Sequence, residues 1–324
     1  SLFAGKVLAF ALAVAAVAGV WMWVNFSTAD IFSQRLDIDL MEVSHSSHLW
    51  GKWTKPGSVK SISILGERNS GTTWLYEHLG ECFNHTVPIR RRLTRYKHWF
   101  QHETDRKDRQ YDHSLVINEF RNVYHWTEAM RKVPHHAPNH VDLKWKEFVT
   151  RTWTMDRVGK DLDMTEEEKV GRVCQEDFYY KDIITCNQRP YPDGYWNASH
   201  KHRYSEHQPF YEMRNDGSGE PYDNILEFRA AKTRNLLSVI NFPWVEDMWV
   251  IRYEDLLAEG TKQIISAVEK ATGVKATCKA SPPQNRKKRS IDKGMKKWLD
   301  DHVDWDAEGL IGYRKDEGLE SKEE

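Results

Sequence analysis

The residues best suited to chemistry lie in one short run between an apolar segment and a segment with helical character. The run reads Gly66-Glu67-Arg68-Asn69-Ser70-Gly71-Thr72-Thr73-Trp74-Leu75. Residues 61–65 are typical of a buried strand, and residues 72–79 read as the first turns of a helix. A strand, a glycine turn and a helix N-terminus direct backbone N–H groups at one point, with the positive end of the helix dipole behind them. We therefore expect this turn to bind phosphate or sulfate.

The spacing of Gly66 and Gly71 matches the nucleotide P-loop, in which a lysine and then a serine or threonine follow the second glycine. Thr72 stands where that lysine is required. The turn is therefore poorly suited to a magnesium-bound polyphosphate. It can still hold a terminal 5′-phosphate that carries a different group.

Residues 70–75, Ser-Gly-Thr-Thr-Trp-Leu, resemble the 5′-phosphosulfate loop of sulfotransferases, whose donor is 3′-phosphoadenosine 5′-phosphosulfate (PAPS). The resemblance implies an α/β fold with a P-loop-type parallel sheet flanked by helices. In the family a basic residue directly precedes the serine, whereas here Asn69 holds that place and Arg68 comes one step earlier, as in relatives with Gly-Glu-Arg-x-Ser-Gly-Thr. We expect Arg68 to turn toward the donor and Trp74 to stack on its adenine. The donor-binding residues expected in this loop are Arg68, Asn69, Ser70, Gly71, Thr72, Thr73 and Trp74.

A basic stretch ends in Lys97-His98, which we expect at the carboxyl end of a second short strand. Ligands bind at that edge of open α/β sheets. Sulfotransferases commonly carry Lys-x-His or Lys-His there, so the resemblance implies that His98 is the general base and Lys97 a second cation beside Arg68. A histidine suits this role because its pKa lies near working pH. The alternative for any one of the 15 histidines is a structural role.

A second family element follows the strand predicted at residues 114–118. Arg121-Asn122 resembles the start of the family's 3′-phosphate element, which implies a bidentate contact from Arg121 to that phosphate. Val123 replaces the usual proline, and Ala129 replaces a serine that donates a hydroxyl. The alternative for Arg121 is a surface arginine at a helix N-terminus.

The strand predicted at residues 248–251 leads into Arg252-Tyr253-Glu254-Asp255-Leu256. Sulfotransferases carry a similar Tyr-Glu-Asp-Leu stretch, which implies that Tyr253 lies nearest the nucleotide while the charged residues pin the strand end. Helices are expected at residues 224–240, 261–272 and 291–300. The basic run 286–289 is expected to close over the 3′-phosphate; a solvated charge run and a convertase cleavage site are its alternatives.

An apolar run of 18 residues, 7–24, is long enough at about 1.5 Å per residue to cross a membrane as a helix. Lys6 precedes it and Asp30 follows, which favours type II topology with a lumenal catalytic part. A cleaved signal peptide is the alternative. We expect a signal anchor at 1–24, a stem at 25–57 and a sulfotransferase-like domain at 58–324, in a Golgi or other secretory-pathway membrane.

The remaining sequence features limit the classes of function that the protein can have. The formal net charge of -1 argues against a nucleic-acid partner. A long insertion at about residues 134–220 has no clear pattern and is where acceptor specificity is expected. Asn-x-Ser/Thr triplets at Asn25, Asn84 and Asn197 agree weakly with a lumenal glycoprotein. Four cysteines without C-x-x-C spacing argue against zinc; in a lumen they allow three connectivities, of which Cys174 with Cys186 is preferred.

The sequence thus predicts transfer of a sulfuryl group from PAPS to a hydroxyl or amine of a glycan, glycoprotein or small-molecule acceptor. Such transfer proceeds by in-line displacement and needs positioned cations and a base but no metal. One alternative is a small-molecule kinase or other P-loop nucleotide-binding enzyme. Others are an inactive lumenal binding protein of the same fold and a membrane precursor cleaved after Arg289.

Overall fold

The computed structural model describes residues 55–83, 85–103, 112–134, 137, 140–153, 214, 221–284 and 291–316. All of them fall in one compact unit, residues 48–324. The predicted anchor, nearly all of the stem, most of the insertion and the basic run 286–289 lie outside the described residues. Among the residues that are described, no helix combines the length and apolarity needed to cross a membrane.

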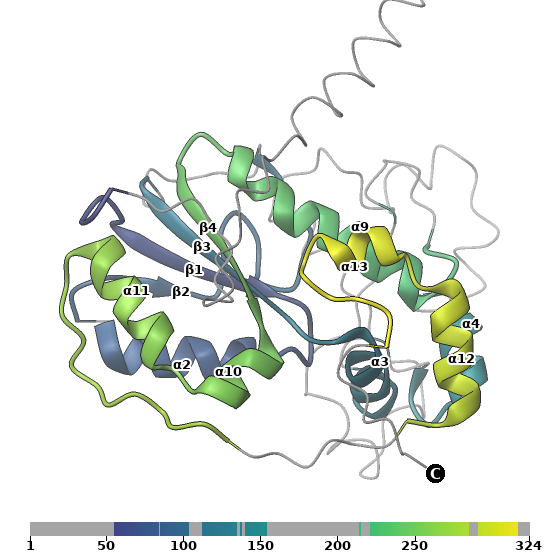
Figure 1. The fold of residues 1–324 in the computed structure, drawn as a ribbon. Coiled ribbons are helices and arrows are strands. Elements are labelled where there is room, and N and C mark those ends of the chain that lie inside the picture. The colour runs from purple at the N-terminus through teal and green to yellow at the C-terminus, as the bar shows by residue number, and fades with distance from the viewer. Residues whose placement is uncertain are drawn as a thin grey trace, which may run out of the picture. The chain divides into compact units, whose positions relative to one another are not determined.

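A four-stranded parallel sheet forms the centre of this unit, with strand order β2-β1-β3-β4 (Figure 1). The strands are β1 (Ser61–Gly66), β2 (Ile89–Arg90), β3 (Ser114–Phe120) and β4 (Val245–Arg252). The α/β class and the parallel sheet flanked by helices are therefore confirmed.

The described helices are α2 (Thr72–Phe83), α3 (Val123–Lys132), α4 (Trp145–Thr150), α9 (Ile225–Ser238), α10 (Tyr253–Glu259), α11 (Lys262–Thr272), α12 (Lys293–His302) and α13 (Trp305–Gly309), with a 3-10 turn η4 (Val239–Asn241) after α9. Four helices, α2, α9, α11 and α12, lie where the sequence predicts them. The side chain of Asn224 caps α9 by accepting from the N–H groups of Leu226 and Glu227. Gly273 ends α11 with a φ of +72°. Helix α4 falls in the insertion, where no pattern predicted an element.

Alternation along the strands separates two apolar faces. Ile62, Ile64, Leu115 and Ile117 pack against α2 and α11, whereas the intervening Val116 and Phe120 pack on the side of α9. Figure 1 shows α2, α10 and α11 on one face of the sheet and α9 on the other. A third core, rich in aromatic rings, joins α3, α4, α9 and α12.

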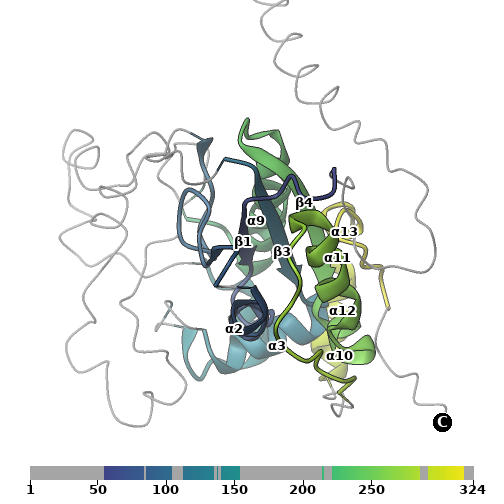
Figure 2. The ribbon, with the colours of Figure 1, turned by 90° about the vertical axis from the view of Figure 1, so that its left-hand side faces the viewer.

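The site is positioned by the order of the strands. From β1 the chain moves to β2 on one side and then to β3 on the other, which creates a topological switch point at the carboxyl ends of β1 and β3. Gly66 lies opposite Glu119, and Glu119 lies opposite Ile251, so three strand ends are level. Helices α2, α3 and α10 begin just after these ends and gather at that edge of the sheet (Figure 2).

Lys97 and His98 lie on a loop rather than at a strand end, so that detail of the expectation is wrong. Strand β2 ends at Arg90, and the chain then makes a tight turn closed by an antiparallel bridge between Arg92 and Tyr96. The side-chain oxygen of Gln101 accepts from two backbone N–H groups of this turn, at 3.0 and 3.1 Å. The turn thereby satisfies locally the donors that a longer strand would have paired.

A disulfide joins Cys82, near the end of α2, to Cys278, at a sequence separation of 196. Thr277 N–H donates to the carbonyl of Cys82, so the segment after α11 is held along α2 by both bonds. The preferred pair Cys174–Cys186 lies outside the described residues; the bond at Cys82 leaves those two cysteines as the remaining pair.

Replacing both Cys82 and Cys278 with serine should lower the free energy of unfolding by roughly 2–4 kcal/mol, because a long loop in the unfolded chain is no longer closed. Urea denaturation of the two proteins under non-reducing conditions measures the difference. Peptide mapping of the wild-type protein should find the two peptides linked, and free thiols at both positions would contradict the assignment.

Candidate functional site

The loop between β1 and α2 requires glycine at both ends. Gly66 has a φ of +145°, and a Cβ there would lie 2.2 Å from the carbonyl oxygen of Glu119. Gly71 has a φ of +102°, and its Cβ would lie 2.4 Å from Oε1 of Glu119. Both the backbone angle and the close approach of β3 therefore exclude a side chain. The glycine spacing seen in the sequence reflects contact with the neighbouring strand.

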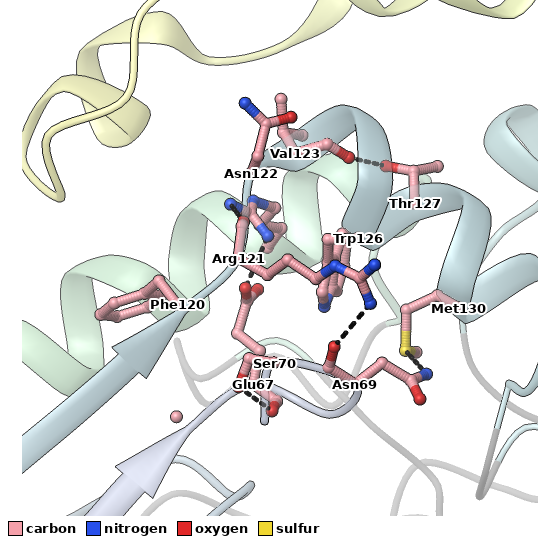
Figure 3. Close-up of polar contacts among 12 residues, drawn as sticks. Glu67, Asn69, Ser70, Phe120, Arg121, Asn122, Val123, Trp126, Thr127 and Met130 are labelled. Carbon is pink, nitrogen blue, oxygen red and sulfur yellow. Dashed lines mark hydrogen bonds and ion pairs between the residues drawn. The ribbon is translucent and has the colours of Figure 1, made fainter. Parts of the chain in front are cut away.

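Three successive carbonyl groups of the loop accept hydrogen bonds from side chains. Ser70 Oγ donates to Glu67 O at 2.7 Å, and Trp126 Nε1 donates to Arg68 O at 2.8 Å. Arg121 Nη1 donates to Asn69 O at 3.2 Å (Figure 3). The C=O and N–H of one peptide unit point in opposite directions. These three bonds therefore fix the directions of the N–H groups of Arg68, Asn69 and Ser70.

The first turn of α2 continues this array of N–H groups. Leu75 N–H donates to Gly71 O, so the N–H groups of Thr72, Thr73 and Trp74 have no acceptor within the helix. They border a cavity of about 400 Å³. The cavity is lined by Asn69, Gly71, Thr72, Thr73, Trp74, Glu77, His98, Tyr253 and Leu257. Amides, a helix N-terminus and a concave space therefore coincide at the predicted anion site.

The backbone of Asn69 shapes the loop, while its side-chain amide bonds to α3 and the residue that follows it. Its φ of +61° places it in the left-handed region, which asparagine tolerates better than most residues. Its Nδ2 donates to Val133 O at 3.0 Å and contacts Met130 Sδ at 3.1 Å, which tethers the loop to the end of α3 (Figure 3). A need for this backbone angle explains an asparagine where the resemblance implies a basic residue.

Lys97 supplies the ammonium group that the loop itself lacks. Its Nζ donates to the hydroxyls of Thr72 and Thr73 at 2.9 and 2.8 Å, and its carbonyl accepts from Gly66 N–H. The residue is 1% exposed and lies behind the two cavity-lining threonines. Burial lowers the pKa of Lys97 to about 8, and the nearby charge of Arg91 acts in the same direction.

His98 lines the cavity with a defined tautomer. Its Nδ1 lies 2.8 Å from Gly66 O. Because a carbonyl oxygen only accepts, Nδ1 carries a proton, and Nε2 is the ring nitrogen that serves as the acceptor in the neutral form. Lys232 Nζ holds the backbone of the same residue by donating to His98 O at 3.1 Å.

Arg121 and Tyr253 meet on the far side of the loop. The guanidinium of Arg121 lies 5.1 Å from the ring centre of Tyr253, and this ring touches the position of Gly71. Glu254 accepts from Asn122 N–H at 3.1 Å and thereby joins the start of α10 to the start of α3. This contact agrees with the expected pinning role of the charged residues after β4.

Arg68 does not line the cavity. Its guanidinium is packed against Trp153 and Phe228, 5.8 and 5.6 Å from the ring centres, and the residue is 4% exposed. The structure therefore brings Lys97, His98, Arg121, Tyr253 and the loop amides together, and directs the side chain of Arg68 into the aromatic core.

Two buried charged residues beside the loop were not predicted. Glu119 is fully buried below Gly71, and neither of its carboxyl oxygens has a hydrogen-bond partner among the described residues. Burial raises the pKa of Glu119 well above its usual range, against the opposing charge of Lys97. Arg229 lies on the apolar stripe of α9, between Ile225 and Leu236. A charged residue at an apolar position of a helix was the available signal.

The described residues contain one group with metal-ligand types close together: His78, Cys82 and Cys278, whose ligand atoms lie within 4.8 Å of one another. Because the two sulfurs are joined in the disulfide, only the imidazole remains as a ligand. His78 instead bonds with Thr261 at 2.8 Å and stacks on Trp74.

Comparison of the chain with models of known protein families, with curated proteins and with solved structures finds no match in any of the three. The interpretation of the site therefore depends on the geometry described above and on the sequence motifs.

Inorganic sulfate should bind more weakly as the pH rises through about 8, because Lys97 loses its positive charge over that range. Lys97→Met should bind sulfate weakly at every pH and lose this dependence. Calorimetric titrations between about pH 6.5 and 9.5 measure both effects, with the exposed Lys60→Met as the control. Equal pH profiles for the wild type and Lys97→Met would show that this ammonium does not act on the anion.

Proposed function

We propose that this chain is a PAPS-dependent sulfotransferase. The observation that carries the proposal is the pairing of Lys97 with Thr72 and Thr73 at the head of an amide-lined loop. A P-loop lysine reaches the β- and γ-phosphates of a nucleotide. Here the ammonium enters from a separate loop and lies behind the helix start, which suits a compact terminal group better than a polyphosphate.

The described residues fit each part of the proposed donor. The amides of residues 70–74 suit the 5′-phosphosulfate, and Arg121 suits the 3′-phosphate. Trp74 and Tyr253 offer two aromatic rings at the cavity for the adenine. The donor would supply a sulfuryl group bound to the 5′-phosphate.

His98 is the proposed general base. The Gly66 carbonyl accepts from Nδ1–H, so in the neutral ring Nε2 is the nitrogen that accepts the proton of the acceptor hydroxyl. The acceptor oxygen forms a bond to sulfur as the bond from sulfur to the 5′-phosphate oxygen breaks. Negative charge growing on that oxygen is met by the loop amides and by Lys97. Adenosine 3′,5′-bisphosphate and a sulfate ester are the products.

We propose a hydroxyl or amine of a glycan, glycoprotein or small molecule as the acceptor, in the lumen of a secretory-pathway membrane. The Cys82–Cys278 disulfide supports an oxidising compartment. Charge and composition give no reason to include a nucleic acid.

A nucleotide-dependent kinase is the second candidate, because Glu119 lies at the end of the strand beside β1, where a carboxylate can reach a magnesium ion near the loop. Burial disfavours this function, because it raises the pKa of Glu119 and so opposes the charged carboxylate that magnesium prefers. Binding of ATP with magnesium in preference to adenosine 3′,5′-bisphosphate would support the kinase.

The direct test of the proposed function is transfer of labelled sulfate from PAPS to a panel of glycans, peptides, sterols and small alcohols by the purified protein. Transfer to one class identifies the acceptor. Tight nucleotide binding without transfer to any acceptor, or to water, would favour an inactive binding protein instead.

Arg121→Ala should weaken the binding of adenosine 3′,5′-bisphosphate about tenfold or more, since hydrogen bonds to charged groups contribute roughly 1.5–3 kcal/mol. The affinity for adenosine 5′-monophosphate should fall by less, because that ligand loses only the contact by which Arg121 holds the carbonyl of Asn69. Arg131→Ala is the control, because Arg131 lies on α3 and bonds to Glu128 away from the cavity. Unchanged bisphosphate affinity in Arg121→Ala would remove the 3′-phosphate assignment.

His98→Ala should keep the nucleotide affinity of the wild type and lose turnover by about 10²–10⁴-fold, as expected for loss of a general base. Single-turnover transfer assays with the best acceptor measure the loss. The control is His113→Ala, because His113 is exposed before β3 and pairs with Glu246. Normal turnover in His98→Ala would mean that another group takes the proton.

A further inference from the structure

Arg229 on α9 is fully buried and lies between two carboxylates. Its Nη1 is 2.5 Å from Glu67 Oε2, and its Nε is 2.5 Å from Glu308 Oε1. The side chains of these three residues are only 1–2% exposed. Glu67 belongs to the anion-binding loop, while Glu308 belongs to α13, so one guanidinium joins the loop to two helices.

The same side chain also holds the strand end that carries Arg121. Nη2 of Arg229 donates to the carbonyl of Arg121 at 2.8 Å, and the guanidinium lies 4.7 Å from the ring centre of Trp126. Trp126 in turn donates to the carbonyl of Arg68 in the loop. Arg229 therefore contacts, directly or through one residue, both elements that would bind the two ends of the donor.

Two buried carboxyl groups contact this one guanidinium, while Lys232 and Arg68 add weaker positive charge near Glu67. Burial raises the pKa of Glu67 to about 8, with the neighbouring Glu308 acting in the same direction against the pull of Arg229. Well-packed neutral residues often replace such a cluster without loss of stability, so stability alone does not explain it.

We infer that Arg229 is a positioning residue, which sets the separation between the anion-binding loop and Arg121 so that one ligand engages both with two anionic groups. This inference rests on the proposed function, in which those groups are the 5′-phosphosulfate and the 3′-phosphate. Arg229 itself is buried behind the loop and does not line the cavity.

The readout is the ratio of affinities for adenosine 3′,5′-bisphosphate and adenosine 5′-monophosphate, since this ratio measures the gain from engaging the second anion. Arg229→Met alone would leave two buried carboxylates without a cation and is expected to be strongly destabilised. The triple variant Glu67→Gln, Arg229→Met, Glu308→Gln removes all three charges together. It should fold, and its ratio of affinities for the bisphosphate and the monophosphate should fall at least fivefold.

Arg234→Met is the matched control. Arg234 also joins α9 to α13, through Asp304 at 2.7 Å, but this pair is exposed and contacts neither the loop nor Arg121. The control should keep the wild-type ratio. A folded triple variant that also keeps the wild-type ratio would overturn the positioning role.

Amide hydrogen exchange without ligand separates this inference from the proposed function. In the triple variant, exchange should accelerate together in residues 66–71 and 119–122 and stay unchanged in α11. Unchanged exchange in either of the first two segments would overturn the positioning role. A wild-type protein that does not prefer the bisphosphate would overturn the proposed function, and the exchange result would then decide the role of Arg229 alone.

Discussion

The site depends on the direction of a few peptide planes. The carbonyls of Glu67, Arg68 and Asn69 all accept from side chains, and the bond to Asn69 O fixes the peptide plane that carries Ser70 N–H. The N–H groups of Thr72, Thr73 and Trp74 have no acceptor within α2, because Leu75 N–H makes its first hydrogen bond. Of the three donors to these carbonyls, one comes from the loop itself, and the other two come from Trp126 and Arg121 on the neighbouring strand and helix. The anion site is therefore built by two parallel strands and cannot form from the loop alone.

Charge reaches this site from outside the loop. Lys97 lies on the segment that follows β2, and its ammonium is fixed by two threonine hydroxyls at the start of α2. The contact between its carbonyl and Gly66 N–H makes this segment and the loop a single unit, in which His98 also takes its place. The position of the Lys97 charge and the tautomer of His98 thus follow from one set of contacts around Gly66.

The strand, glycine turn and helix of the site were predictable because their signals are local, namely the glycine spacing and the apolar residues on either side of it. The direction of Arg68 was not, since it depends on Trp153 and Phe228, which lie far away in the sequence. The loop position of Lys97 likewise depends on a tight turn held by Gln101. Contacts between distant segments leave no periodic pattern, and they decide where these side chains point.

A crystal structure with adenosine 3′,5′-bisphosphate tests the central claim most directly. The account predicts the 5′-phosphate within hydrogen-bond distance of the amides of residues 70–73 and the 3′-phosphate against the guanidinium of Arg121. A nucleotide bound elsewhere, or with its 5′-phosphate away from the start of α2, would contradict it.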